Sequence, residues 1–350
     1  MMKKKSIILF LALCLALGGC QKKDEGPTRV ETGMSEIENQ YYDKALENFQ
    51  AALSEDDEDE KLMAYRGAGM AYMGLGQYDM AAASFEEALK RTTDKMPDTK
   101  KDILYYKATA QYKMGDYEAA AASCNEILGI KGEADAYYLR GASYLANQEQ
   151  DKAKIDFDAA AALAPKDYDL FLNIYMCYEE QKLSANGDEY LQKALAIQGT
   201  ETKDYYNRGR IYYYLEDYEA AQRELVKPVE EKDAASLLLM GKVYMALSDT
   251  AHSKVMYQQY IDAYGETPEA YNGLALAEMS DGNYDAALAD IAKGLGLDEE
   301  KGKQELYFNE IVAYENKKDF STAKVKAEAY VQMYPGDEQG KKEYDFLSTR

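Results

Sequence analysis

The sequence predicts an all-α protein, built as a solenoid in which helical hairpins stack one after another along the chain. Two observations lead to this prediction. A pattern of aromatic and small residues returns every 32–39 residues through most of the 350-residue chain, and repeats of this length are typical of stacked supersecondary units. The composition also suits packed helices, because it is rich in Tyr and Ala and contains only 6 Pro.

The N-terminus carries an export pattern. Lys3–Lys5 give a positive start, and Ile7–Leu17 is an uninterrupted apolar run of eleven residues. A membrane-spanning helix needs about 20 apolar residues, so a run of this length indicates a signal peptide. The sequence Leu-Gly-Gly-Cys that ends at Cys20 resembles the lipobox of bacterial lipoproteins, in which small residues let a dedicated peptidase cut before a Cys. The resemblance implies that residues 1–19 are removed and that Cys20 receives a diacylglycerol with fatty acyl chains such as palmitate.

Residues 20–28 are expected to form the lipidated Cys and a flexible tether, because the segment is short and polar and contains Gly26 and Pro27. Each buried methylene of a lipid chain adds about 0.8 kcal/mol of membrane affinity, so two or three chains would hold the protein durably. The expected location is the extracytoplasmic side of a bacterial cell membrane. The sequence favours neither a one-membrane nor a two-membrane organism.

The charge balance narrows the range of partners. The chain has 63 acidic and 41 basic residues, which gives a formal net charge of -22. Nucleic acid requires a basic face, so nucleic-acid binding is disfavoured. Removal of residues 1–19 would take away three Lys and no acid, which makes the mature body still more negative.

Each repeat follows the same column pattern. The second repeat starts at Tyr65 and continues with Gly69 at +4, Tyr72 at +7, Ala81 at +16 and Phe85 at +20. Small residues at +4 and +16 would let two helices approach closely, and the large residues fill the space beside them. The +16 column identifies nine repeats and runs through Ala45, Ala81, Ala120, Ala153, Gly187, Ala221, Ser253, Ala287 and Ala323.

The pattern resembles the tetratricopeptide repeat, a helix-turn-helix unit of about 34 residues. Gly115–Ala120 (GDYEAA) and Gly282–Ala287 (GNYDAA) carry the resemblance most clearly, at the start of the second helix of a repeat. The resemblance implies a right-handed α-solenoid of about nine such repeats over residues 29–336. Residues 337–350 are expected to form a C-terminal capping helix that covers the last apolar face.

Some repeats depart from the pattern. The fifth has Tyr175 where a small residue is usual, and Ser184–Gly187 in place of the tight turn, so its second helix is expected to begin late. The seventh has Ser253 in the Ala column, and the ninth has Ile311 for the small residue of its first helix. We expect these repeats to pack more loosely.

A second stripe of the first helices, at +1, +5 and +8, is rich in Tyr, Met and Leu, with isolated cations. In tetratricopeptide arrays this stripe tends to line the concave side of the superhelix. Tyr and Met suit a groove for an extended or helical segment of another protein, but neighbouring first helices could also bury part of the stripe as core. The candidate groove residues are Arg66, Met70, Met73, Tyr105, Tyr112, Tyr138, Met176, Tyr206, Arg210, Tyr213, Lys242, Met245, Met279 and Phe308.

The sequence offers no catalytic constellation. Its single His, His252, is expected at the surface of a second helix, and the acidic run Ser54–Glu60 lacks the glycine-bearing spacing of a calcium loop and is interpreted as a solvated loop. No phosphate-binding GxxxxGKS/T, HExxH or GxSxG motif is present. We therefore expect no enzymatic activity, no cofactor and no metal site.

The favoured function is a lipid-anchored extracytoplasmic scaffold that binds a protein or peptide of the cell envelope in the concave groove. The alternative is a solute- or glycan-capturing surface lipoprotein, which Tyr could serve but the absence of Trp disfavours. Some tetratricopeptide arrays grip a terminal carboxylate with Lys and Asn. Asn173, Lys203 and Asn207 echo that set, but the preceding helix offers Tyr138 and Ala142 instead of Lys and Asn. The sequence does not specify an oligomeric state.

Overall fold

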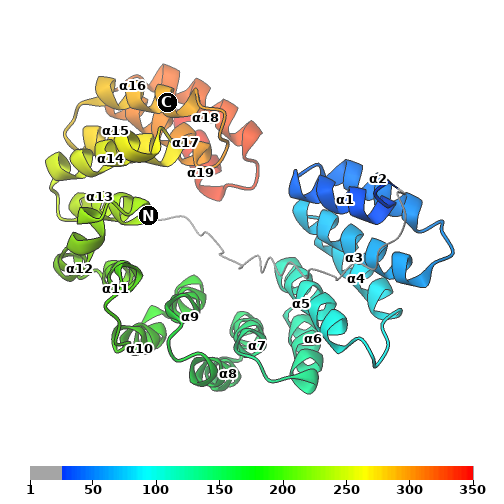
Figure 1. Ribbon diagram of the computed structural model, residues 1–350. Helices are drawn as coiled ribbons and strands as arrows, with labels where there is room; N and C mark the ends of the chain where they lie inside the picture. Colours follow the sequence, from blue (N-terminus) through cyan, green and yellow to red (C-terminus); the bar gives the residue numbers. More distant parts are fainter. Residues whose placement is uncertain (1–25, 350) are drawn as a thin grey trace. The chain divides into compact units, whose positions relative to one another are not determined.

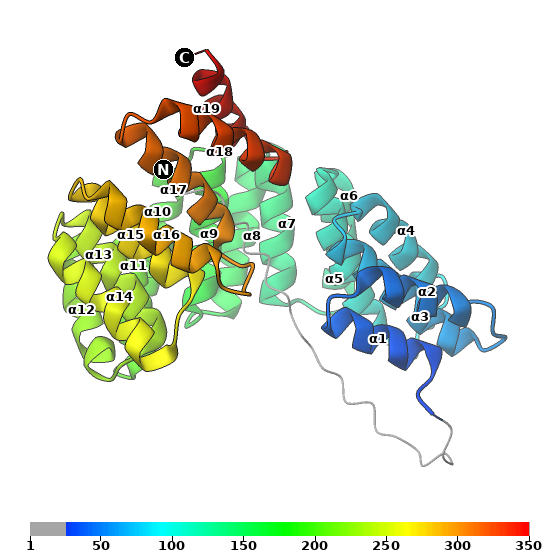
Figure 2. The same cartoon turned by 90° about the horizontal axis from the view of Figure 1, so that it is seen from above.

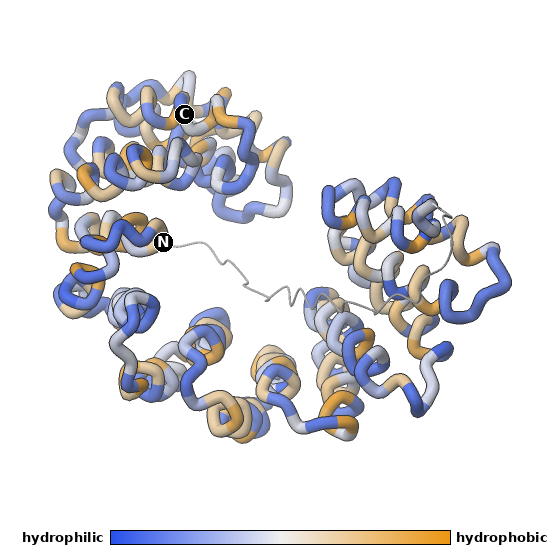
Figure 3. Tube along the Cα trace, in the orientation of Figure 1, coloured by the Kyte–Doolittle hydropathy of each residue, from blue (hydrophilic) through white to orange (hydrophobic). Residues whose placement is uncertain are grey.

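The computed structural model describes residues 26–349, and within this range it contains nineteen α-helices and no strand. The predicted all-α solenoid class is confirmed. The predicted signal peptide (1–19) and Cys20 lie outside the described residues. Hydrophilic residues recur along the helices (Figure 3), and between residues 26 and 349 no helix is both long and apolar enough to cross a membrane.

The described part of the chain divides into two compact units with a boundary after Ala194 in the sequence: unit 1 up to this residue and unit 2 from Leu195 onward. The helices of unit 1 are α1 (Arg29–Glu38), α2 (Tyr42–Ala52), α3 (Glu58–Gly74), α4 (Tyr78–Leu89), α5 (Pro97–Met114), α6 (Tyr117–Ile130), α7 (Ala134–Ala146), α8 (Gln150–Leu163), α9 (Tyr168–Glu180) and α10 (Ser184–Leu195). The helices of unit 2 are α11 (Thr202–Tyr214), α12 (Tyr218–Glu230), α13 (Ala234–Ala246), α14 (Thr250–Tyr264), α15 (Pro268–Ser280), α16 (Tyr284–Leu295), α17 (Lys303–Asn316), α18 (Phe320–Met333) and α19 (Glu338–Ser348).

Odd-numbered and even-numbered helices pair into hairpins that stack in chain order within each unit (Figures 1 and 2). Successive first helices also touch each other: α1, α3, α5, α7 and α9 do so in unit 1, and α11, α13, α15 and α17 in unit 2. Within unit 1 the first helices lie on the inner side of the bend and the second helices on the outer side (Figure 1), and in both units the first helices are the ones that touch one another. The inner face of each unit is therefore made of first-helix residues.

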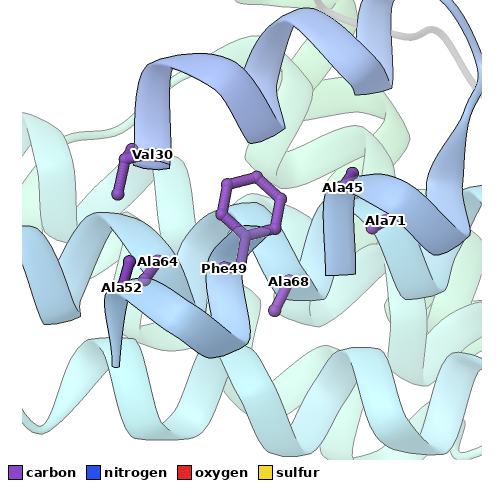
Figure 4. Close-up of a cluster of buried hydrophobic side chains, with 7 residues drawn as sticks. All are labelled: Val30, Ala45, Phe49, Ala52, Ala64, Ala68 and Ala71. Carbon is purple, nitrogen blue, oxygen red and sulfur yellow. The ribbon is translucent and has the colours of Figure 1, made fainter. Parts of the chain in front are cut away.

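Large side chains of the second helices pack into spaces beside small residues of the first helices. We call each such space a seat. Phe49 of α2 is fully buried and is surrounded by small residues of α1 to α3 (Figure 4). Its ring lies against Gly33 of its own first helix and Gly67 of the next one, and a Cβ at Gly33 would approach the ring to 2.7 Å. No methyl group fits at that distance, so the two glycines are required by packing.

The same arrangement occurs in unit 2. The Tyr257 ring of α14 lies between Gly241 of α13 and Gly273 of α15, and a Cβ at Gly241 would lie 2.7 Å from the ring. In the third repeat both partners change together, because Cys124 takes the place of the ring and Ala108 the place of the glycine, and both are fully buried. A smaller side chain on one helix is matched by a larger one on the other.

The fifth repeat shows the same compensation with the roles exchanged. Tyr175 of α9 is buried, and Gly187 of α10 lies against it. A Cβ at Gly187 would come within 3.1 Å of the Tyr175 Cα, so glycine on the second helix makes room for the aromatic residue on the first. The prediction that the second helix begins late is wrong, because α10 starts at Ser184, which belongs to its first turn. The turn between α9 and α10 lies at Lys182, which has a left-handed backbone and precedes the first residue of α10 by two positions.

The expected looseness of the seventh and ninth repeats is also wrong at the substituted positions. Ser253 is fully buried, and its hydroxyl donates a hydrogen bond to the Gly241 carbonyl oxygen at 2.8 Å. Ile311 is fully buried among Ala323, Ala327 and Tyr330. A satisfied hydroxyl and a filled apolar site both maintain close packing.

Every hairpin turn between residues 26 and 349 contains one residue with a left-handed backbone, five residues before the buried small residue of the second helix. Only three of these nine residues are glycines, although glycine adopts this conformation at the lowest cost. They are Gln40, Gly76, Gly115, Gln148, Lys182, Glu216, Ser248, Gly282 and Lys318.

Two further sequence interpretations can be compared with the structure. The acidic run Ser54–Glu60 is only partly a loop, since Asp57 caps α3 and Glu58–Glu60 form the first turn of that helix. Acidic residues favour this position because the helix N-terminus carries partial positive charge. His252 lies exposed on α14, as expected, with Nδ1 2.6 Å from the Asp249 carboxylate.

The last helix, α19, packs against α18. Leu347 is buried in this contact, and Gly340 lies directly against the Tyr330 ring. Gly340 therefore provides for Tyr330 the same seat that Gly67 and Gly273 provide for the rings of earlier repeats.

The glycine seats generate a stability prediction. Gly273→Ala should lower the free energy of unfolding by about 1–3 kcal/mol, because the new methyl group collides with the Tyr257 ring. The matched control is Gly129→Ala in α6, where a Cβ meets nothing within 4 Å, so it should be neutral or stabilise by up to about 1 kcal/mol. Urea denaturation followed by circular dichroism measures both. Equal midpoints for the two variants would contradict the packing argument.

Candidate functional site

The fourteen candidate groove residues all lie on first helices, seven in each unit. Unit 1 holds Arg66, Met70 and Met73 on α3, Tyr105 and Tyr112 on α5, Tyr138 on α7 and Met176 on α9. Unit 2 holds Tyr206, Arg210 and Tyr213 on α11, Lys242 and Met245 on α13, Met279 on α15 and Phe308 on α17. All fourteen are half-buried. Because successive first helices touch within each unit, each set lies along one row of adjoining helices.

In unit 1 this surface is tied together by polar contacts between neighbouring first helices. The Arg66 guanidinium on α3 bonds the Asp102 carboxylate on α5 at 2.6 Å. The Tyr105 hydroxyl on α5 donates to the Glu133 carboxylate at 3.2 Å, and Lys101 forms an ion pair with the same carboxylate at 2.8 Å. These side chains join neighbouring repeats. Their acidic partners, Asp102 and Glu133, lie about one repeat later in the chain, and the stripe pattern in the sequence did not identify them.

Between α7 and α9 the stripe is core. Ala142, Leu145 and Leu172, which occupy stripe positions, are 4%, 2% and 1% exposed. Tyr138 of α7 lies 3.5 Å from the Cys177 sulfur of α9 through its hydroxyl. At these three aliphatic positions the stripe is therefore buried between neighbouring helices and does not line a groove.

Burial controls the protonation of the groups around Tyr138. It raises the pKa of the Tyr138 hydroxyl well above its ordinary value, and the nearby Cys177 adds to the rise. Burial also raises the pKa of the Cys177 thiol, to about 12, against a weaker opposing effect of the Tyr138 hydroxyl. Both groups are neutral at physiological pH, so this cluster offers no nucleophile or charge to a ligand.

The first helix of unit 2 carries an aromatic group with a cation. The Arg210 guanidinium lies over the Tyr206 ring at 5.5 Å and donates to the Asn207 side-chain oxygen at 3.0 Å. Tyr206 and Tyr213 pack against the cluster that contains Leu225 and Leu237. These residues combine an apolar contact inside the unit with a half-exposed polar edge.

Further along unit 2 the inner face is open. Lys242 of α13 and Glu269 of α15 form an ion pair at 2.6 Å with side chains 43% and 48% exposed. The Asn309 amide of α17 donates to the Asn272 side-chain oxygen of α15 at 2.7 Å. Leu276, at the same repeat position as Lys242, is 38% exposed. This face therefore offers both an exposed apolar residue and polar pairs, a combination found at ligand-contacting surfaces.

The two residues of unit 2 that echo a carboxylate-binding set already have partners within the protein. Lys203 pairs with Glu201 at 2.9 Å, and Asn207 accepts the hydrogen bond from Arg210. Among residues 26–349, no group of three or more His, Cys, Asp and Glu residues is arranged to hold a metal ion.

Stacked helical hairpins with a half-buried inner stripe define a helical-repeat protein of the kind that binds other proteins. Profiles described as tetratricopeptide repeat match residues 30–97, 66–133 and 238–300, and a second profile of the same description matches 134–167 and 205–227. Together the matches cover more than half of the chain. The chain belongs to the tetratricopeptide repeat family, whose members mediate protein–protein interactions and are mostly non-enzymatic scaffolds.

Curated relatives share the repeats over part of their length. The Hsp70-Hsp90 organizing protein of Triticum aestivum is 23% identical over 224 residues, which cover 55% of this chain and 38% of that protein. The Hsp70-Hsp90 organizing protein 2 of Arabidopsis thaliana is 23% identical over 244 residues, covering 60% and 42%. The chain thus spans less than half the length of these relatives.

A solved structure shows the same fold. The crystal structure of a tetratricopeptide repeat protein from Parabacteroides merdae aligns with a TM-score of 0.51 and 16% identity, over 82% of this chain and 98% of that chain. This likeness concerns the fold alone.

The two thiols within the repeats provide a prediction. Cys124 is buried and Cys177 half-buried, both are free, and burial raises the pKa of each to about 12. At pH 8 both should react with iodoacetamide at least ~100-fold more slowly in the folded protein than in urea, where the pKa returns to its ordinary value. Peptide mapping by mass spectrometry distinguishes the sites. Rapid labelling of Cys177 in the folded protein would contradict this environment.

Proposed function

We propose that this protein is a lipid-anchored extracytoplasmic scaffold that binds a protein or peptide partner of the cell envelope on the inner faces of its first helices. The mechanism is docking on a preformed surface, with no chemical step. Because the hairpins hold the surface in place before binding, the partner alone has to be ordered, which lowers the entropic cost of association.

The open inner face of unit 2 carries this proposal. Leu276 of α15 is exposed, and the Lys242–Glu269 pair joins the same helix to α13, so this face combines apolar area with polar groups that fix orientation. Family membership supports a protein as the ligand class. The names of the Hsp70-Hsp90 organizing relatives also fit a protein partner, while the envelope partner follows from the export pattern.

The membrane anchor is supported by the N-terminal sequence. Three Lys, an eleven-residue apolar run and a small-residue site before Cys20 agree with lipoprotein processing. The polar segment up to Pro27 would then separate the first helix from the membrane surface. Since the body is strongly acidic, repulsion from an anionic leaflet would keep it away from the bilayer.

The anchor is tested by Cys20→Ser in the native host or a bacterial expression host. Wild-type protein should incorporate an alkyne-palmitate label and fractionate with membranes after removal of the signal peptide. The Ser variant should incorporate no label and should retain residues 1–19, because cleavage follows lipidation. Label on the Ser variant, or wild-type protein free of lipid, would contradict the lipoprotein assignment.

The docking face is tested by photo-crosslinking in intact cells. A photo-reactive residue at Lys242, on the inner face, should give a discrete crosslinked protein. The same residue at Val255, which is 46% exposed and lies two positions after the buried Ser253 on the outer side of α14, should give little. Equal products from both positions, or none from Lys242, would contradict inner-face binding.

A further inference from the structure

We infer that the docking surface is confined to unit 2 and that its occupant is an amphipathic protein segment with an apolar face and basic flanks. This inference rests on the proposed function and specifies its ligand. The contact surface, called here the unit 2 strip, consists of apolar side chains on α13, α15 and α17: Leu238, Met245, Leu276, Met279 and Phe308.

The first argument is the contrast between the two units. In α7 and α9 of unit 1, Ala142, Leu145 and Leu172 are 4%, 2% and 1% exposed, so these stripe positions are already covered by neighbouring helices. In unit 2 all five residues of the strip keep solvent exposure, and Leu276 is 38% exposed. The +5 and +8 columns are therefore internal contacts at Ala142 and Leu145 of α7 and accessible at Leu276 and Met279 of α15, while Met70 and Met73 of α3 are half-buried like most of the strip.

The second argument concerns the polar groups on the strip. Lys242 and Glu269 neutralise each other at 2.6 Å, and Asn309 donates to Asn272 at 2.7 Å. These four side chains already pair with one another without a ligand. A charged residue placed against the strip would lose hydration and find no dedicated partner, which is costly. The face of the occupant that contacts the strip must therefore be apolar, and the two Met residues suit aliphatic or aromatic side chains of various shapes.

The third argument is charge. The chain has a net charge of -22, so a long-range field attracts cationic segments and repels acidic ones. A second copy of the chain carries the same charge and would be repelled, and an anionic membrane surface would be repelled as well. A segment with Lys or Arg beside its apolar face would contact the strip through its apolar side chains, and its cations would be attracted by the acidic surroundings.

The experiment uses the full chain in detergent and two fluorescein-labelled peptides. Both are amphipathic helices with Leu on one face, and the other face carries Lys in one peptide and Glu in its twin. Fluorescence anisotropy at low and high salt gives the affinities. Because all protein variants share the same detergent, partition of the peptide into micelles cancels when variants are compared.

The Lys peptide should bind about tenfold or more tightly than the Glu peptide at low salt, and the difference should shrink at high salt. Leu276→Gln and Met279→Gln should each weaken binding of the Lys peptide by about tenfold. Met73→Gln occupies the same repeat position as Met279 but lies in unit 1, so it tests the restriction to unit 2 and should stay within about twofold of wild type. Val255→Gln on the outer side of α14 is the matched control and should also stay within about twofold, with thermal unfolding confirming that each variant is folded.

Each other result overturns the inference in a recognisable way. Equal binding of the two peptides would show that the occupant needs no basic flanks. A loss in Met73→Gln equal to that of the strip variants would show that unit 1 also binds the peptide. An equal loss in Val255→Gln, or no effect of the two strip variants, would mean that the peptide adheres by charge alone. If neither peptide binds while Lys242 still crosslinks a protein in cells, the proposed function stands and the ligand chemistry inferred here is wrong.

Discussion

The fold depends on the contact between a bulky side chain of each second helix and the small residues of the first helices on either side. Phe49 and Tyr257 each occupy a seat made by two glycines, one from their own repeat and one from the next. This contact holds a hairpin together and also joins it to its neighbour. The separation of adjacent first helices, and with it the exposure of the inner face, follows from how these seats are filled.

Much of the fold is readable from the sequence because the repeat columns report contacts within one hairpin. Nine hairpins and a final helix follow directly from the recurring small and aromatic residues. Compensating changes are harder to read, since Tyr175 and Gly187 each look like a departure when considered alone. They become one well-packed contact only when the two positions are known to face each other. The expected loop at Glu58–Glu60 failed for a similar reason, because the carboxylate of Asp57 makes that acidic run a helix start.

The candidate site was predictable only in part. The +1, +5 and +8 spacing places its side chains on one stripe of each first helix, but their exposure depends on how closely successive hairpins approach. That distance is not encoded in any single repeat. Leu145 and Leu276 both belong to the stripe, yet one is 2% exposed and the other 38%. The polar partners were missed because each lies about one repeat away, as Asp102 does from Arg66 and Glu269 from Lys242.

The seat shared between neighbouring repeats also governs how such a chain can change its length during evolution. A break between hairpins would separate the Tyr257 ring from Gly273 and leave an apolar half-seat on each fragment. Gly340 of α19 shows how the array is closed, since a lone first helix completes the seat of Tyr330. Because each ring needs a small residue from the first helices on both sides, a duplication or deletion keeps every seat complete only when it adds or removes a whole repeat length and leaves a closing first helix such as α19 at the end.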